Sequence, residues 1–310
     1  MELSFLILKQ IVSMFLMIVV GYVLVRSKAV EKNLGTFLAK VVMYVVLPCT
    51  IVDAFQIDND PKTFSNLLFA FVVALVFNIL LIILSYAFKS IFKMNEIEQA
   101  SVAYPNSGDI LIPLVTSVLS PTMTVYCCAF MVVQLLFMFT HGVNLLANDS
   151  EKNLSNILKN PNVIAIVIGI LLLAMNITIP EIVGNVIDSF ASMVAPLSML
   201  VIGCSIANCD LKRGLAKKRT YLIVLIRQVI FPILFLGIIK ITSLDTFIQD
   251  GASILLILYM AVASSPAATI VNIVQSHDMD SSYASIINVV GVICLIFTMP
   301  IMVFIFQMFI

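Results

Sequence analysis

Runs of about twenty predominantly apolar residues recur along the whole chain, and this repetition limits the fold more than any other feature of the sequence. An α-helix of that length rises roughly 30 Å, which is the thickness of the hydrocarbon core of a bilayer. Membrane-spanning β-barrels carry shorter segments of alternating hydrophobicity instead. Hydrophobic residues make up 61% of the chain and charged residues only 11%, outside the balance of soluble domains. The sequence therefore predicts an all-α integral membrane protein.

Ten membrane-spanning helices, joined by short connections, can be drawn through these runs. They cover residues 5–25, 34–55, 64–88, 98–118, 122–146, 161–178, 186–207, 219–240, 252–275 and 282–307. Twelve Lys and Arg residues occupy the loops after the first, third, fifth and seventh spans, and three lie near the opposite boundary. Because positive charge collects on the cytoplasmic side, we expect a multi-pass protein of the inner (plasma) membrane with both termini outside. The formal net charge of +0 gives no basic surface for nucleic acid.

A polar loop over residues 147–160 divides the chain into two halves, 1–146 and 161–310, with five spans each. We expect this loop to be a cytoplasmic linker. An odd number of spans per half forces the second half to enter the membrane upside down relative to the first. The sequence thus predicts two inverted five-helix repeats.

The fourth and ninth spans are interrupted by residues that suit neither a helix interior nor a bilayer. The fourth is broken from Asn106 to Pro113, and the ninth carries Ser264, Ser265 and Pro266. Proline costs about 3 kcal/mol in a helix interior, and an aspartate at bilayer depth costs about 2.5–3.5 kcal/mol. Paired interruptions at corresponding positions of two repeats are typical of a transport site at the membrane midplane. We expect the two broken helices to cross.

Crossed broken helices would bring both kinds of helix end to one polar cavity. The free N–H groups of one half attract an anion, and the free C=O groups of the other attract a cation. No catalytic residue, metal site or cofactor is expected beyond a coupling ion, H⁺ or Na⁺. The candidate substrate- and ion-binding residues are Asn106, Ser107, Gly108, Asp109, Pro113, Ser264, Ser265, Pro266, Thr269, Asn272 and Arg227.

Two charged residues among these candidates have alternative interpretations. Asp109 lies roughly 16 Å into the membrane by helical rise, near the midplane, where it serves the site or caps the second half-helix. Arg227 lies roughly 12 Å deep, where it snorkels to the cytoplasmic face or pairs with Asp109 or an anionic substrate. A third residue, Asp53, falls near the outer interface.

The remaining polar residues of the spans are expected to be structural. The six cysteines and the lone His141 lack metal-ligand spacing. Asn78, Gln134, Asn144 and Asn288 are expected to hydrogen-bond between helices. The sequence from Asn106 to Asp109 lacks the first glycine of the GxGD pattern of intramembrane proteases, so an enzyme is not predicted. A continuous polar lining or carbonyl filter typical of a channel is not visible.

Three local motifs resemble the auxin efflux carrier family, which includes the plant PIN-type exporters and bacterial malate and malonate permeases. Span two carries Tyr44-Val-Val-Leu-Pro48, span four carries Asn106-x-Gly-x-x-x-Ile-Pro-Leu114, and span nine carries Ser265-Pro-Ala-Ala-Thr269. Each is similar to a family motif, and they occur in order at the matching spans. The chain departs from the family pattern at Asp109, Leu111 and Ile270.

The resemblance implies a secondary transporter of a small organic anion, such as malate, malonate or an auxin-like acid. It implies that spans 3–5 and 8–10 form a moving transport domain, while spans 1, 2, 6 and 7 form a scaffold that makes a homodimer in the bilayer. It also implies elevator-type alternating access in which Pro113 and Pro266 mark the crossing of the two broken helices, with coupling to H⁺ or Na⁺ left open. The alternative is a membrane receptor or sensor with a transporter-like fold.

Overall fold

The chain folds into helices, as its apolar runs predict. The structure is a computed structural model that describes residues 2–31, 33–57, 61–119, 121–147, 158–209, 217–276 and 279–310. Within these ranges there is no β-strand, and an isolated bridge is the one element of β pairing. The all-α prediction is confirmed for this part of the chain.

Most helices are long and several contain a π-helical turn. In chain order they are α1 (Glu2–Arg26), α2 (Leu34–Val41), η1 (Val42–Val46), α3 (Leu47–Ala54), α4 (Pro61–Phe92), α5 (Glu96–Ala103), η2 (Ser107–Leu111), α6 (Ile112–Val118), α7 (Pro121–Phe137), η3 (Met138–Gly142), α8 (Val143–Ala147), α10 (Pro161–Ala174), α11 (Glu181–Ala191), α12 (Val194–Asn208), α14 (Lys218–Leu225), η4 (Ile226–Ile230), α15 (Phe231–Thr242), η5 (Leu244–Thr246), α16 (Gly251–Ala263), α17 (Ala268–Ser276) and α18 (Ser281–Phe309). Each of the ten predicted spans therefore contains helix.

Seven helical stretches of the described chain are long and apolar enough to cross a membrane. Three shorter apolar helices, Ser107–Val118, Pro161–Ala174 and Gly251–Ala263, fall within the predicted spans four, six and nine. Spans four and nine are short because each is divided at its interruption. The predicted division into ten spans and two inverted repeats goes beyond what helix length establishes and remains a prediction.

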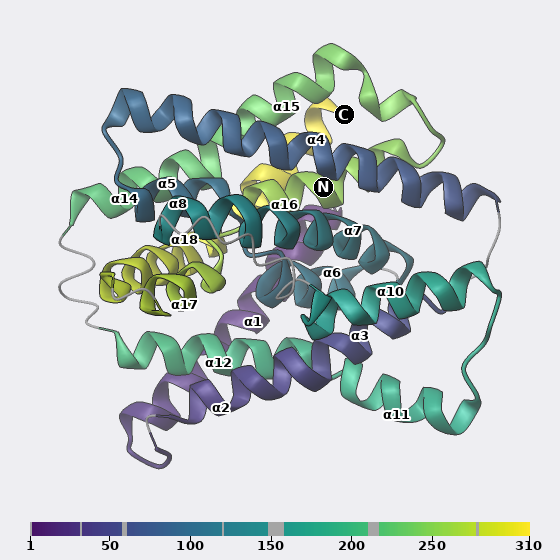
Figure 1. The fold of residues 1–310 in the computed structure, drawn as a ribbon, viewed down its shortest axis with the longest axis horizontal. Helices are drawn as coiled ribbons and strands as arrows, with labels where there is room; N and C mark the ends of the chain where they lie inside the picture. The colour runs from purple at the N-terminus through teal and green to yellow at the C-terminus, as the bar shows by residue number, and fades with distance from the viewer. Residues whose placement is uncertain are drawn as a thin grey trace.

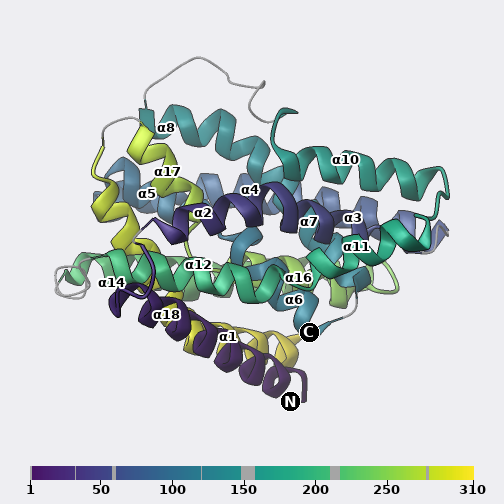
Figure 2. The same ribbon diagram turned by 90° about the horizontal axis from the view of Figure 1, so that it is seen from below.

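The helices form two groups that pack side by side (Figure 1). The first, here the α1 group, contains α1, α2, η1, α3, α10, α11 and α12; α1 packs on α12, and α3 packs on α10 and α11. The second, here the α4 group, contains the other helices; α4 packs on α5, α7 and α16, and α18 packs on α14, α16 and α17. The groups meet where α1 and α12 face α6 and α18, and where α3 packs on α7. Figure 2 shows α1 beside α18, with the two chain termini near each other.

Two glycines allow α1 and α12 to approach closely. A Cβ atom on Gly21 would lie 2.5 Å from the carbonyl oxygen of Leu200, and one on Gly203 would overlap the backbone of Ile18. Small residues at such crossings let helix backbones pack where a bilayer gives no hydrophobic driving force. The α1 group is therefore built on a backbone-to-backbone contact.

The π-helical turns explain how three prolines fit inside long helices. Turns η1, η2 and η4 end two residues before Pro48, Pro113 and Pro232. A proline ring clashes with the carbonyl four residues earlier and donates no hydrogen bond, and a wider π turn relieves both problems. Because the helix passes through Pro113 in this way, the predicted break from Asn106 to Pro113 is too long. The observed break ends at Asn106.

An ion pair with a buried carboxylate joins three helices of the α4 group at one end of the bundle. Arg219 of α14 donates two hydrogen bonds, of 2.9 and 2.8 Å, to the carboxylate of Glu98 on α5. Tyr283 of α18 donates a third, of 2.6 Å, to the same carboxylate. Glu98 is only 3% exposed, so these donors offset the cost of burying its charge.

A second ion pair joins α4 to α16 at the opposite end. The ammonium group of Lys62 lies 3.0 Å from the carboxylate of Asp250, and the side-chain amide of Asn66 donates to the same oxygen at 2.8 Å. The hydrogen bonds from Lys62 and then Asn66 lower the pKa of Asp250. The α4 group is thus held by polar contacts at both of its ends.

Candidate functional site

The two interrupted helices meet at the centre of the α4 group. α5 ends at Ala103 and α16 ends at Ala263, and an antiparallel bridge pairs Pro105 with Pro266 just beyond them. The backbone N–H of Asn106 donates to the carbonyl of Ser265 at 2.7 Å. We call this contact the crossover. It joins residues that the sequence places in different halves of the chain.

A reciprocal bond completes the crossover and corrects one sequence prediction. The N–H of Ala267 donates to the carbonyl of Tyr104 at 2.9 Å. The prolines at the crossing are therefore Pro105 and Pro266, whereas Pro113 lies within the first turn of α6. Pro105 suits the crossing because the stretch between α5 and η2 is extended, and the residue before a proline favours that conformation.

Side chains satisfy the backbone groups that the two breaks set free. Ser264 donates its hydroxyl to the carbonyl of Asn106 at 2.9 Å. The Gln134 amide on α7 donates to the carbonyl of Pro105 and accepts from the hydroxyl of Ser107 at 2.6 Å. Asn106, Ser107, Gln134 and Ser264 are at most 4% exposed. Water cannot reach their polar groups, so hydrogen bonds within the protein offset the cost of burying them.

The helix restarts after each break with two partly exposed residues. Gly108 and Asp109 are partly exposed in η2, and Ala268 and Thr269 are partly exposed in α17, while their neighbours are buried. Asn106 caps the first restart, since its side-chain oxygen accepts the N–H of Asp109 at 3.0 Å. Asn106, rather than Asp109, is therefore the cap, and Asp109 is a partly exposed acidic residue in the first turn of the restarted helix.

Arg227 lies on the other side of the crossover, against the carbonyl ends of α5 and α16. It projects from η4, is 0% exposed, and donates to the carbonyls of Val102 in α5 at 3.2 Å and Ala261 in α16 at 3.4 Å. It does not snorkel to the cytoplasmic face, and it forms no ion pair with Asp109 among the described residues. This geometry contradicts both the predicted snorkelling of Arg227 and its predicted ion pair with Asp109.

The other predicted site residues lie at different distances from the crossover. Ser265 is buried, and its hydroxyl has no hydrogen-bond partner in the described chain. Asn272 is exposed on α17, one turn beyond Thr269. Asp53 is half-buried in α3 of the α1 group. The structure thus brings the two serines and Asn106 together and leaves Asn272 and Asp53 outside the crossover.

Three residues that the sequence analysis treated as structural, Gln134, His141 and Asn288, lie at or near the crossover. The Asn288 amide on α18 donates to the carbonyl of Pro266 at 2.6 Å. His141 and Tyr104 form a pair in which the imidazole Nδ1 lies 2.6 Å from the phenol oxygen. Each is a polar residue in an apolar run. That signal was visible, but the partners, backbone carbonyls for Gln134 and Asn288 and a phenol for His141, are distant in sequence.

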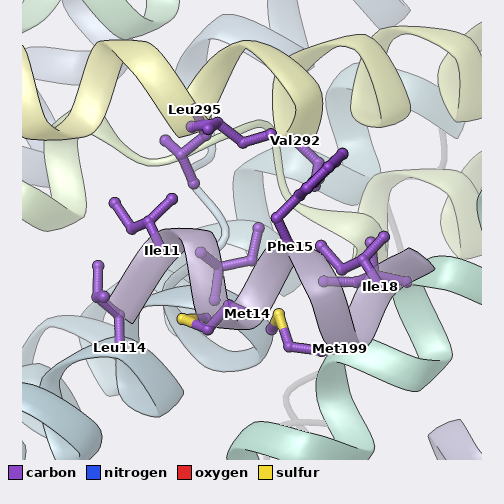
Figure 3. Close-up of a pocket in the computed structure, with 11 residues that line it drawn as sticks. Ile11, Met14, Phe15, Ile18, Leu114, Met199, Val292 and Leu295 are labelled. Atoms are coloured by element: carbon purple, nitrogen blue, oxygen red, sulfur yellow. The ribbon is translucent and has the colours of Figure 1, made fainter. Parts of the chain in front are cut away.

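An apolar cavity lies where the two helix groups meet beside the crossover. Its volume is about 30 Å³, and apolar side chains line it. In Figure 3, side chains of α1 point into it together with Leu114, Met199, Val292 and Leu295 from the facing helices. Ile110, the residue after Asp109, completes this wall. Hydrocarbon surface therefore lines this part of the boundary between the two helix groups.

A comparison with known protein families finds one match over almost the whole chain. The family model described as membrane transport protein matches residues 6–303. No curated protein sequence matches the chain.

Proposed function

The chain belongs to the membrane transport protein family, that of the auxin efflux carriers, and from this premise we propose that it is a secondary transporter of a small organic anion. The family is one of membrane transporters, in agreement with the seven apolar helices. The observation that carries the proposal is the crossover, in which two broken helices present their ends to one place inside the protein. Transporters built from broken helices bind substrate and coupling ion at such ends.

The start of α17 is the better place for the anionic group of the substrate. Both helix restarts present free N–H groups with partial positive charge. At η2 one of these groups is capped by Asn106, and Asp109 adds a negative charge. At α17 the partly exposed residues are Ala268 and Thr269, which carry no charge. We therefore assign the carboxylate of the substrate to α17, and a coupling cation or proton to Asp109.

The contact between the helix groups favours an elevator-type movement. The cavity wall on both sides consists of aliphatic and aromatic side chains and methionines, so a shift of one group along the other breaks few polar contacts. The polar contacts at Glu98 and at Asp250 join helices of the α4 group to one another. We propose that the α4 group moves as the transport domain and that the α1 group is the scaffold, which also forms a homodimer. The two inverted five-helix repeats and the outside location of both termini belong to the same proposal.

Uptake into proteoliposomes tests the function directly. Labelled malate, malonate and indole-3-acetate are offered under imposed proton and sodium gradients, and we expect one class of carboxylate to accumulate inside. Thr269→Val should lower uptake at least tenfold, because it removes a polar group at the start of α17. The matched control is Thr242→Val, at the exposed end of α15, which should leave uptake unchanged. Saturable binding of a carboxylate without accumulation would instead favour the receptor alternative.

A further inference from the structure

Arg227 joins the carbonyl ends of both broken helices, and we propose that its guanidinium is a resident cation that takes the place of a sodium ion at the crossover. The inference rests on the proposed transport function and adds to it that sodium does not bind at these helix ends. Half-helix carbonyls are where transporters with broken helices commonly coordinate Na⁺. In this protein the carbonyls of Val102 and Ala261 accept N–H groups of Arg227 instead.

The charges balance in sign and size. The C-terminal end of a helix carries roughly half a negative charge through its aligned peptide dipoles, so two ends together carry about one. One guanidinium supplies one positive charge, and it is never deprotonated under ordinary conditions. Arg227 is fully buried, and it is in none of the ion pairs of the described chain. The two helix ends are therefore its counter-charge.

The fork geometry of arginine explains why this residue suits the position. Its two terminal nitrogens donate to two carbonyls that come from helices in different halves of the chain. Its third nitrogen, Nε, is buried and has no partner within the described residues. A guanidinium in this position fills the space in front of the carbonyls and repels a second cation. On this proposal sodium coupling at these helix ends is excluded, and a proton rather than sodium is assigned to Asp109 as the coupling ion.

Melting temperatures of the purified protein in detergent test this proposal without knowledge of the substrate. The probes are the chloride salts of sodium, potassium and choline at constant ionic strength. We expect the same melting temperature for the wild type in all three. A saturable increase in sodium alone would overturn the proposal. Because this measurement does not involve transport, its result does not depend on whether the proposed transport function is correct.

Substitutions at position 227 separate charge from shape. Arg227→Lys keeps the charge and should melt close to the wild type, whereas Arg227→Gln is neutral and should melt roughly 5 °C or more lower.

Low-millimolar guanidinium or sodium should restore part of the melting temperature lost in Arg227→Ala. Gln228→Ala is the matched control, because Gln228 is also fully buried and donates to the carbonyl of Gly291 at 2.7 Å but carries no charge. It should be destabilised without rescue by either cation. Equal stability of the Lys and Gln variants would overturn the proposal, as would equal rescue of the Gln228 variant.

Discussion

Asn106 is bonded to Ser265 through its backbone N–H, at 2.7 Å, and to Ser264 through its carbonyl, at 2.9 Å. One residue of the first half of the chain thus hydrogen-bonds to two residues of the second half, at the point where both helices end. Its side chain adds a third function, since it caps the restarted helix at Asp109. The ends of the two broken helices are therefore fixed relative to each other, and a site built on these ends is formed before any ligand binds.

Replacing Asn106 should affect stability and transport, whereas replacing another capping asparagine should affect stability alone. Asn106→Ala removes the bond to the N–H of Asp109 and should lower the free energy of unfolding by about 1 kcal/mol. Asn160→Ala is the control, since Asn160 caps α10 through the N–H of Asn162 at 2.9 Å. We expect similar losses of melting temperature in both variants and a loss of uptake in Asn106→Ala alone. Equal uptake by both would show that the cap at the crossover has no part in transport.

Gly203→Ala should disrupt the α1 group. The added methyl group would overlap the backbone of Ile18 in α1, and backbone cannot move aside as a flexible side chain can. We expect a loss of several kcal/mol in unfolding free energy, in the range of about 2–4, or failure to fold. Gly237→Ala in α15 is the control, because nothing lies within 4 Å of the added atom. That variant should be unchanged or more stable by about 0.5–1 kcal/mol, since alanine favours helix. Melting temperatures of the two purified variants make the comparison.

Local chemistry predicted much of this fold. The apolar runs indicated the helices, and Pro266 with its two serines indicated a break where one occurs. The family resemblance, based on three short motifs, is confirmed by the match to residues 6–303. The choice of Pro113 over Pro105 for the crossing was wrong, because a proline can break a helix or sit inside one after a π turn. The sequence of the turn does not distinguish these cases.

The partners of the buried polar residues could not be predicted. Arg227 has neither carboxylate nor solvent for a partner, and its bonds to Val102 and Ala261 depend on how two distant helix ends meet. Gln134 and Asn288 likewise bind backbone carbonyls of the breaks. A polar residue in an apolar run shows that a partner is needed. It does not show which carbonyl, among many identical ones, supplies it.

The ion pair at Asp250 should give a small stability that depends on pH. Lys62 and Asn66 lower the pKa of Asp250 in the folded protein. The resulting stability is therefore present above the unfolded pKa, about 3.9, and is lost as the pH falls through the lower folded value. Both partners are partly exposed, so we expect less than about 1 kcal/mol. Asp250→Asn should melt below the wild type at pH 7 and match it at a pH below the folded pKa. A difference that persists unchanged in acid would contradict this account.

Crosslinks should distinguish movement between the helix groups from movement within one. Ile11 of α1 and Leu114 of α6 line the same cavity from opposite groups (Figure 3). In a background without the six native cysteines, Ile11→Cys with Leu114→Cys, joined by a short bifunctional thiol reagent, should stop uptake, and cleavage of the link should restore it. The control joins Lys62→Cys to Asp250→Cys, whose native side chains lie 3.0 Å apart within the α4 group. If that group moves as one body, this link leaves uptake unchanged. Continued uptake with the first pair linked would contradict the elevator movement, because α1 and α6 could not then slide past each other.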